Sequence, residues 1–300
     1  MRRALGCTRH HAGATLHPCV RFAEQAGAAC ITTELARRWA TQPVDVHPAH
    51  GATRRSPVRR FAQYCRATAP QTEIPPHGLL PYRYDRTPPS ISTEQEISQL
   101  LAAAHQLPSL TGLRANTSAT VLGLLAVTGM RVSAAVGLER EDGDLTDGSL
   151  TIRHTTCGKT RGLPLHPSTQ HALEQYAGRR DSRWPQPQAP RFFLSERGTR
   201  LTPWSVRQTF VQLSRHIGLR GATARHGPRR HDLRHRFAVR TRRTWHGAGV
   251  HGEQRLPTLA AYLGHAHVHA TYWSRSATPA LLRVAMPRLT TDAEGTHPAS

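Results

Sequence analysis

Lysine is nearly absent from this 300-residue sequence: Lys159 is the only one, and arginine supplies all the other basic residues among the 40 Lys and Arg. Acidic residues are also scarce, with 19 Asp and Glu, so the formal net charge is +21 at pH 7 with neutral His. A chain with such an excess repels itself unless a polyanion neutralises it. Nucleic acid is therefore the first expected partner, and an anionic membrane surface the second.

Long hydrophobic runs and paired cysteines are lacking too. The longest mainly apolar stretch, residues 119–130, is too short to span a bilayer, and no basic helix with an aromatic face indicates a membrane surface. The basic N-terminus carries no apolar segment typical of a secretory signal. Five scattered cysteines form no framework of pairs, which favours a reducing cytoplasm. The Cys and His residues near the N-terminus match no closed zinc site, so we expect no metal: Cys7, His10, His11, His17 and Cys19.

Prolines divide the chain into two parts. They stand so close together over residues 70–91 that no helix can form there, which predicts a stiff linker. A small helical domain is expected before the linker and a larger domain after it. The predicted bounds are a disordered or truncated start over 1–17, a helical domain over 18–74, a Pro-rich linker over 75–91, the larger domain over 92–289 and a disordered tail over 290–300.

The expected fold is mainly α with one small antiparallel β-sheet. Two short strand patterns, 150–153 and 162–165, are joined by a polar turn through Lys159. Ser56 is the expected N-cap of one helix, and Ser92 to Gln95 is typical of a capping box. The predicted helices cover residues 19–26, 33–41, 56–67, a stretch opened by that capping box, 118–128, 131–138, 168–176, 204–216, 231–241, 256–263 and 279–288.

Two basic residues stand at positions that suggest chemistry. Arg131 follows a glycine break, Gly129, at the end of the buried helical stretch; alone, it is equally well explained as a surface residue. Lys159 is expected at the tip of a hairpin. Arginine cannot give up a proton near neutral pH, whereas lysine can. A single lysine in a chain that otherwise uses arginine therefore indicates a proton donor rather than a solvated turn residue.

Histidines complete the set of candidates. His231 and Arg234 are three residues apart, so they share one face of a helix, and an imidazole beside a guanidinium suits a phosphodiester. His265 follows Gly264 at an expected helix end, and the aromatic pair Tyr272–Trp273 comes soon after. Each signal alone has an ordinary explanation, such as one surface histidine among 20.

Taken in order, these motifs resemble the tyrosine recombinase (phage integrase) family. They comprise an arginine, a hairpin lysine, His-x-x-Arg, Gly-His and a C-terminal aromatic position, and the flanking segments Leu-Ala-Val-Thr-Gly-Met-Arg-Val-Ser and His-Asp-Leu-Arg-His-Arg-Phe-Ala agree with the family. The resemblance covers residues 92–288. It is weaker over the front helices, which include residues 31–36. It implies an integrase-type catalytic domain at 92–289, after a helical (SAM-like) core-binding domain at 18–74.

The resemblance also implies a reaction. Arg131, His231, Arg234 and His265 would surround a scissile phosphate, and Lys159 would protonate the leaving 5′-oxygen. A tyrosine would attack, with His231 handling its proton, and leave a 3′-phosphotyrosyl link. The bond energy is kept, so the reaction needs no ATP, metal or cofactor. The implied function is site-specific DNA recombination or integration in the cytoplasm, on nucleoid DNA. The partners would be double-stranded DNA and further copies of the chain, as dimer to tetramer.

The nucleophile departs from the family pattern. It usually lies nine residues after the histidine of Gly-His, where this sequence has Ser274. Tyr272, the fallback nucleophile, stands two residues earlier, which on a helix turns the side chain by ~200° and moves it ~3 Å. Ala134 also replaces an acidic residue that relatives often carry. Two hypotheses therefore stay open: a recombinase of a mobile element, or a catalytically inactive DNA-binding protein derived from one. Type IB topoisomerases share part of the constellation but lack the Gly-His segment.

Overall fold

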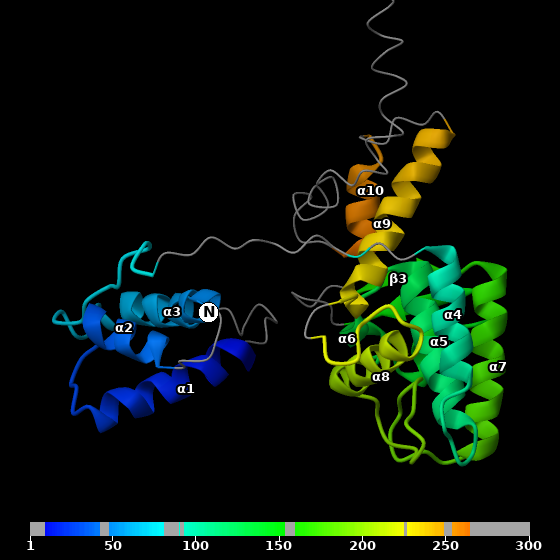
Figure 1. The fold of residues 1–300 in the computed structure, drawn as a ribbon, viewed down its shortest axis with the longest axis horizontal. Helices are drawn as coiled ribbons and strands as arrows, with labels where there is room; N and C mark the ends of the chain where they lie inside the picture. Colours follow the sequence, from blue (N-terminus) through cyan, green and yellow to red (C-terminus); the bar gives the residue numbers. More distant parts are fainter. Residues whose placement is uncertain are drawn as a thin grey trace, which may run out of the picture. The chain divides into compact units, whose positions relative to one another are not determined.

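The computed structural model describes residues 10–42, 48–80, 90, 93–153, 160–224, 227–248 and 254–264. The chain divides into two compact units, Met1–Pro88 and Pro89–Ser300 (Figure 1). Their assignment to a core-binding and a catalytic domain with the bounds given above stays a prediction. Within the described residues, no helix is both long and apolar enough to cross a membrane.

The described residues of the first unit form three helices: α1 (His10–Gln25), α2 (Thr33–Thr41) and α3 (Pro48–Cys65). Trp39 of α2 is the centre of their small core, which Cys19 of α1 and Val58 of α3 join. The sequence pattern predicts a disordered or truncated start through residue 17, whereas α1 already begins at His10. Part of the reason is Leu16, which packs against this core.

Helix α3 also starts earlier than its pattern predicts. The predicted N-cap, Ser56, and the following Pro57 lie inside the helix, which begins instead at Pro48, a residue suited to a first helical position. Val58 and Ala62 are fully buried. Their packing outweighs the helical hydrogen bond that Pro57 cannot make.

The Pro-rich segment after α3 is held against that helix by arginines. Arg55 Nη1 donates to the Pro76 carbonyl at 2.7 Å, and Arg59 donates to the Pro75 carbonyl. Arg54 lies over the Trp39 ring, 4.1 Å from its centroid. The described part of the segment, through residue 80, contains no helix, as its prolines predict.

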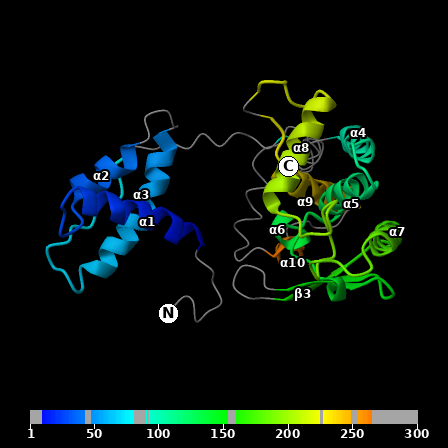
Figure 2. The same ribbon diagram turned by 90° about the horizontal axis from the view of Figure 1, so that it is seen from below.

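The second unit is a helical domain with one small sheet, which confirms the predicted fold class. Helix α5 lies between α4 and α7 (Figure 2) and also packs against α9. The strands are antiparallel in the order β1–β2–β3, with Leu150 opposite Leu163 and Ile152 opposite Arg161. The elements are α4 (Glu94–His105), α5 (Leu113–Thr128), α6 (Val132–Ala135), the 3-10 turn η1 (Arg140–Asp142), β1 (Gly143–Asp144), β2 (Ser149–Ile152), β3 (Arg161–Pro164), α7 (Pro167–Arg183), α8 (Pro203–His216), α9 (Arg230–Gly247) and α10 (Leu256–Leu263).

Several bounds differ from the sequence pattern. The capping box of α4 uses Thr93 and Glu96, one residue later than predicted. Helix α5 begins at Leu113, because the distant Glu196 accepts hydrogen bonds from the backbone N–H groups of Thr111 and Arg114, each at 2.9 Å. The predicted helix over 131–138 is only the single turn α6.

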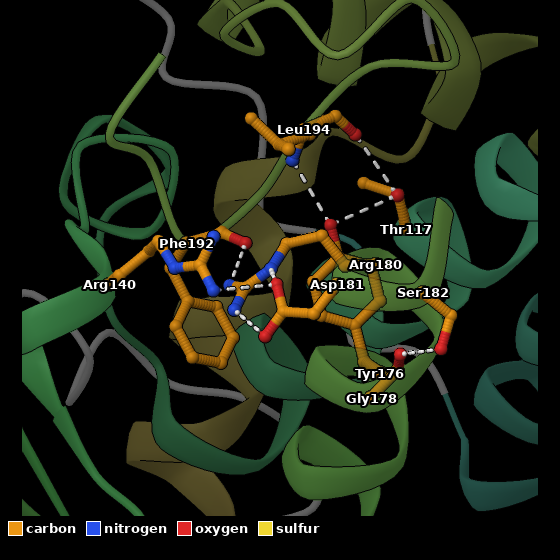
Figure 3. Close-up of polar contacts among 9 residues, drawn as sticks. All are labelled: Thr117, Arg140, Tyr176, Gly178, Arg180, Asp181, Ser182, Phe192 and Leu194. Atoms are coloured by element: carbon orange, nitrogen blue, oxygen red, sulfur yellow. Dashed lines mark hydrogen bonds and ion pairs between the residues drawn. The ribbon is translucent and has the colours of Figure 1, made fainter. Parts of the chain in front are cut away.

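Helix α7 runs on to Arg183, beyond the predicted end at Tyr176, because tertiary contacts anchor its last turns (Figure 3). The Tyr176 hydroxyl accepts from the Leu194 N–H at 3.0 Å, and Arg180 Nη1 donates to the Phe192 carbonyl at 2.8 Å. Arg180, which is 3% exposed, also pairs with Asp181. These contacts join α7 to the segment of residues 192–194.

Candidate functional site

The ends of two helices form the frame of the candidate site. Helix α5 ends at Gly129 with φ +61°, and α10 ends at Gly264 with φ +68°. A Cβ on Gly129 would also lie 2.6 Å from Cδ1 of Phe237 on α9. Both glycines therefore adopt a backbone conformation that a side chain disfavours, and Gly129 has no room for one.

Backbone carbonyls at these helix ends orient Arg131 and Arg234. Arg131 Nη1 donates to the Gly264 carbonyl at 2.9 Å. Arg234 donates from Nη1 to the Gly129 carbonyl at 2.8 Å and from Nη2 to the Leu263 carbonyl at 2.9 Å. Helix C-termini carry partial negative charge, so they favour cations. The two guanidinium groups are therefore held in place by α5 and α10 rather than by acidic side chains.

A third guanidinium joins them. Arg161, at the start of β3, lies against Gly264, where an added Cβ would collide with Arg161 Nη1. No carboxylate among the described residues forms an ion pair with Arg131, Arg161 or Arg234. The cluster therefore concentrates positive charge that no neighbouring carboxylate neutralises.

The pKa of Arg234 reflects this crowding. The side chain is 4% exposed, and its burial, followed by the charges of Arg131 and Arg161, lowers its pKa to about 9. Burial and the charge of Arg131 likewise lower the pKa of Arg161. An anion placed among these side chains would relieve the repulsion that lowers both values.

His231 stands in the first turn of α9, one turn before Arg234, and is exposed at the surface. The burial of part of its ring lowers its pKa, and the charge of Arg234 adds to this, while Asp232 opposes it. Asp232 caps the helix by accepting a hydrogen bond from the Arg229 N–H at 2.9 Å. His231 is therefore favoured in its neutral form, which can accept a proton.

The structure brings together three of the predicted site residues, Arg131, His231 and Arg234. Arg131 lies close enough to both other residues to lower their pKa values. Their catalytic roles stay predictions. Four further candidates and the predicted last helix, 279–288, lie outside the described residues: Lys159, His265, Tyr272 and Ser274.

Sequence reasoning gave no role to Arg161. The one feature of the sequence that could have indicated a role in the site is its position two residues after Lys159, in the same predicted hairpin. Its proximity to Gly264 depends on how β3 packs against the end of α10, which no local pattern reveals. Tyr262 of α10 was not singled out either; its ring stacks on Phe237, with centroids 5.5 Å apart and planes at 18°.

The comparison with protein families identifies this arrangement. Residues 91–275 match the model of the phage integrase family. The chain belongs to that family. It is 43% identical over 293 residues to the integrase/recombinase y4rB of Sinorhizobium fredii, covering 96% of this chain and 93% of that protein. It is also 36% identical over 188 residues to the tyrosine recombinase XerD of Mycobacterium tuberculosis, covering 62% of this chain and 56% of XerD.

Solved structures of integrases and recombinases share the fold. The integrase of transposon Tn1549 in complex with transposon right end DNA matches with a TM-score of 0.65 at 18% identity, over 96% of both chains. The recombinase XerA matches with a TM-score of 0.53 at 19% identity, over 97% of this chain and 94% of that one. The predicted resemblance to tyrosine recombinases is thereby confirmed.

Proposed function

We propose that this phage integrase family member carries out site-specific DNA recombination, by strand exchange through a 3′-phosphotyrosyl intermediate. The observation that carries the proposal is the guanidinium pair of Arg131 and Arg234, which helix-end carbonyls orient and to which no carboxylate of the described residues is paired. Such a preorganised pair suits the oxygens of a phosphodiester. Each donor aimed at developing charge contributes about 3 kcal/mol to catalysis.

The residues of the site divide the chemistry between them. Arg131 and Arg234 stabilise the pentacoordinate phosphate, and neutral His231 takes the proton of the attacking hydroxyl. Lys159 protonates the leaving 5′-oxygen, and His265 completes the phosphate contacts. The 3′-phosphotyrosyl link keeps the energy of the broken bond, so the strand is rejoined without ATP, metal or cofactor.

Double-stranded DNA is the proposed partner, bound on the nucleoid in the cytoplasm. The net charge of +21 supplies the electrostatic attraction, and arginines near His231 extend the basic surface. Arg230 of α9 and Arg207 of α8 lie close enough for their charges to interact. Strand exchange joins two DNA duplexes, so we propose that the chain self-associates on DNA, as dimer to tetramer. The Tn1549 integrase and XerH, a further structural match, have each been solved in complex with DNA.

A second candidate function is favoured by Ser274. If the segment after Gly264 keeps the family register, a serine stands where the nucleophile belongs. Its hydroxyl is shorter and far less acidic than a phenol. The chain would then bind its DNA site without cutting it, as a DNA-binding protein derived from a recombinase. Tyr272 serves as nucleophile only if that segment shifts by two residues.

A suicide substrate separates these candidates. Nicked duplexes carrying a panel of mobile-element end sequences would be incubated with the full chain, and covalent protein–DNA adducts resolved on denaturing gels. Four proteins are compared: the unaltered chain, Ser274→Tyr, Tyr272→Phe and the double variant. An adduct formed by the unaltered chain and lost in Tyr272→Phe supports recombination through Tyr272.

An adduct that forms only with Ser274→Tyr, and persists in the double variant, supports the non-cleaving binder with an otherwise intact site. Arg234→Met in the Ser274→Tyr background is the matched control, and it should remove the adduct. If Ser274→Tyr and the unaltered chain both bind a duplex tightly yet form no adduct with it, the recombinase proposal is wrong.

A further inference from the structure

Arg161 is the member of the arginine cluster in which two buried donors have no acceptor. Its Nε and Nη1 atoms are both buried and have no hydrogen-bond partner. Buried donors without an acceptor are rare in folded proteins, because each loses its bonds to water and gains nothing in return. A guanidinium buried in this way calls for an explanation beyond packing.

The position of Arg161 supplies that explanation. Arg131 and Arg234 donate to the successive carbonyls of Gly264 and Leu263, and Arg161 Nη1 lies against the same Gly264. Arg131 Nη1 is 3.6 Å from the place where a Cβ on Gly264 would stand. Three guanidinium groups, from the N-cap of α6, from α9 and from β3, therefore meet at the end of α10.

The three differ in how their donors are used. Arg131 and Arg234 use N–H groups on carbonyls that fix their direction, whereas Arg161 has both Nε–H and Nη1–H unused. Among the described residues, none offers Arg161 a carboxylate. The Tyr262 hydroxyl lies close enough to interact with the charge of Arg161, but neither Nε nor Nη1 forms a hydrogen bond with it. An anion bound at this place would supply the acceptor that the described residues do not offer.

We propose that Arg161 is a third phosphate ligand of this site and donates a hydrogen bond to a non-bridging oxygen of the phosphodiester held by Arg131 and Arg234. The proposal rests on the proposed function, since it takes that phosphodiester as the anion. It gives β3 a role in the site, in addition to the role predicted from the sequence for Lys159. Guanidinium groups from three separate parts of the fold would then donate hydrogen bonds to one phosphate before any strand is cut.

Inorganic phosphate is a probe that needs no knowledge of the DNA target. The thermal unfolding of the full chain would be followed against phosphate concentration, with sodium chloride matching the ionic strength. We compare the unaltered chain with Arg161→Met, which keeps the aliphatic stem, and Arg161→Lys, which keeps one charge. Arg215→Met, on the exposed side of α8, is the control for the loss of one surface charge.

Phosphate should raise the unfolding temperature of the unaltered chain in a saturable way. Arg161→Met should unfold at no lower a temperature than the unaltered chain without phosphate, because two buried donors without a partner have been removed. Its apparent phosphate affinity should fall about tenfold, the value of one charge-assisted hydrogen bond. The phosphate affinity of Arg161→Lys should lie between those of Arg161→Met and the unaltered chain. Arg215→Met should keep the phosphate response of the unaltered chain.

A merely structural Arg161 gives the opposite pattern. Arg161→Met would then unfold at a lower temperature with the phosphate affinity unchanged, and this result overturns the proposal. The phosphate responses of Arg131→Met and Arg234→Met show whether such a result concerns Arg161 alone or the proposed function as well. If these two lose the phosphate response and Arg161→Met keeps it, the phosphate site stands without Arg161. If the unaltered chain shows no response beyond the chloride control, both proposals fall.

Discussion

At the scale of single residues, the site is built from cationic side chains that form no ion pair with a carboxylate in the part of the chain that the structure describes. Arg234 is nearly fully buried, yet its partners are the neutral carbonyls of Gly129 and Leu263. The sequence could predict Arg131 and Arg234, because each stands beside a local signal: a glycine break for one, a His-x-x-Arg spacing for the other. Arg161 could not be predicted, since its meaning depends on contact with Gly264, which is distant in the sequence.

The lowered pKa of His231 can be tested through the pH dependence of stability. Its pKa lies below the ordinary value of 6.5, chiefly through burial, and that of His235 is lowered in the same direction. The unfolded chain therefore takes up these protons at a higher pH than the folded one. The free energy of unfolding should fall as the pH drops below about 6.5.

His231→Gln should flatten that decline, and the double variant with His235→Gln should flatten it further. Urea titrations of the full chain at pH values from 7.5 to 5 would measure the slope. A slope for His231→Gln equal to that of the unaltered chain would show that His231 does not resist protonation in the folded state.

At the scale of elements, local signals set some bounds and tertiary contacts set others. Helices α2 and α10 match their predicted ranges, because the N-cap Thr32 starts α2 and Gly264 ends α10. Helix α5 departs from its pattern, since its start is fixed by Glu196, far along the chain. The sequence of the last turns of α7 is mostly polar, and tertiary contacts such as the hydrogen bond from Arg180 to the Phe192 carbonyl hold these turns as helix.

The end of α5 gives a sharp test at this scale. Gly129→Ala should destabilise the second unit by roughly 3 kcal/mol, because alanine disfavours a positive φ and its Cβ would collide with Phe237. Gly178→Ala is the matched control, since Gly178 lies inside α7 with no atom near an added Cβ. That change should stabilise by about 0.5–1 kcal/mol.

Chemical unfolding of both variants measures the difference. Equal effects of the two substitutions would show that the backbone conformation and packing at Gly129 do not constrain the site. Thermal melts in phosphate would show in addition whether Gly129→Ala disturbs the orientation of Arg131 and Arg234.

A second element-scale test concerns the start of α5. Glu196 accepts from the backbone and hydroxyl of Thr111, the Arg114 N–H and the Ser109 hydroxyl. Desolvation raises its pKa, but these hydrogen bonds outweigh it and bring the pKa to about 2. The stability that the carboxylate contributes is present above its unfolded pKa and is lost as the pH falls toward 2.

Glu196→Ala should therefore cost about 1–2 kcal/mol at pH 7, the range for losing a helix cap, and much less at pH 3. Glu24→Ala, a change of an exposed residue in the first unit, is the control for the loss of one negative charge. A loss for Glu196→Ala that is the same at both pH values would contradict this capping role.

At the scale of the whole molecule, composition indicated the partner that we propose, and periodicity predicted the fold class. The spacing of apolar residues and the glycine breaks predicted the mainly α fold with one small sheet, and the family comparison agrees. Strand β1 was missed, because two residues carry no alternating pattern. The approach of β3 to α10 was missed for a different reason: it arises only when separate elements pack together.

The charge of the molecule leads to a test in solution. With a net charge of +21, the logarithm of the affinity for duplex DNA should fall linearly with the logarithm of salt concentration, since each neutralised phosphate releases counterions. The slope is roughly −0.9 per contacted phosphate. Fluorescence anisotropy over a range of salt concentrations would measure it, and an affinity independent of salt would contradict binding through the arginines.

The central claim is that Arg131 and Arg234 form a site for one tetrahedral phosphate, and a crystal of the full chain soaked in tungstate tests it most directly. Tungstate has the shape and charge of a phosphate and gives an anomalous signal. The predicted result is a tungsten peak whose oxygens lie about 3 Å from guanidinium nitrogens of both residues, at the ends of α5 and α10. Tungstate bound elsewhere on the protein, with this site empty in the same crystal, would contradict the account.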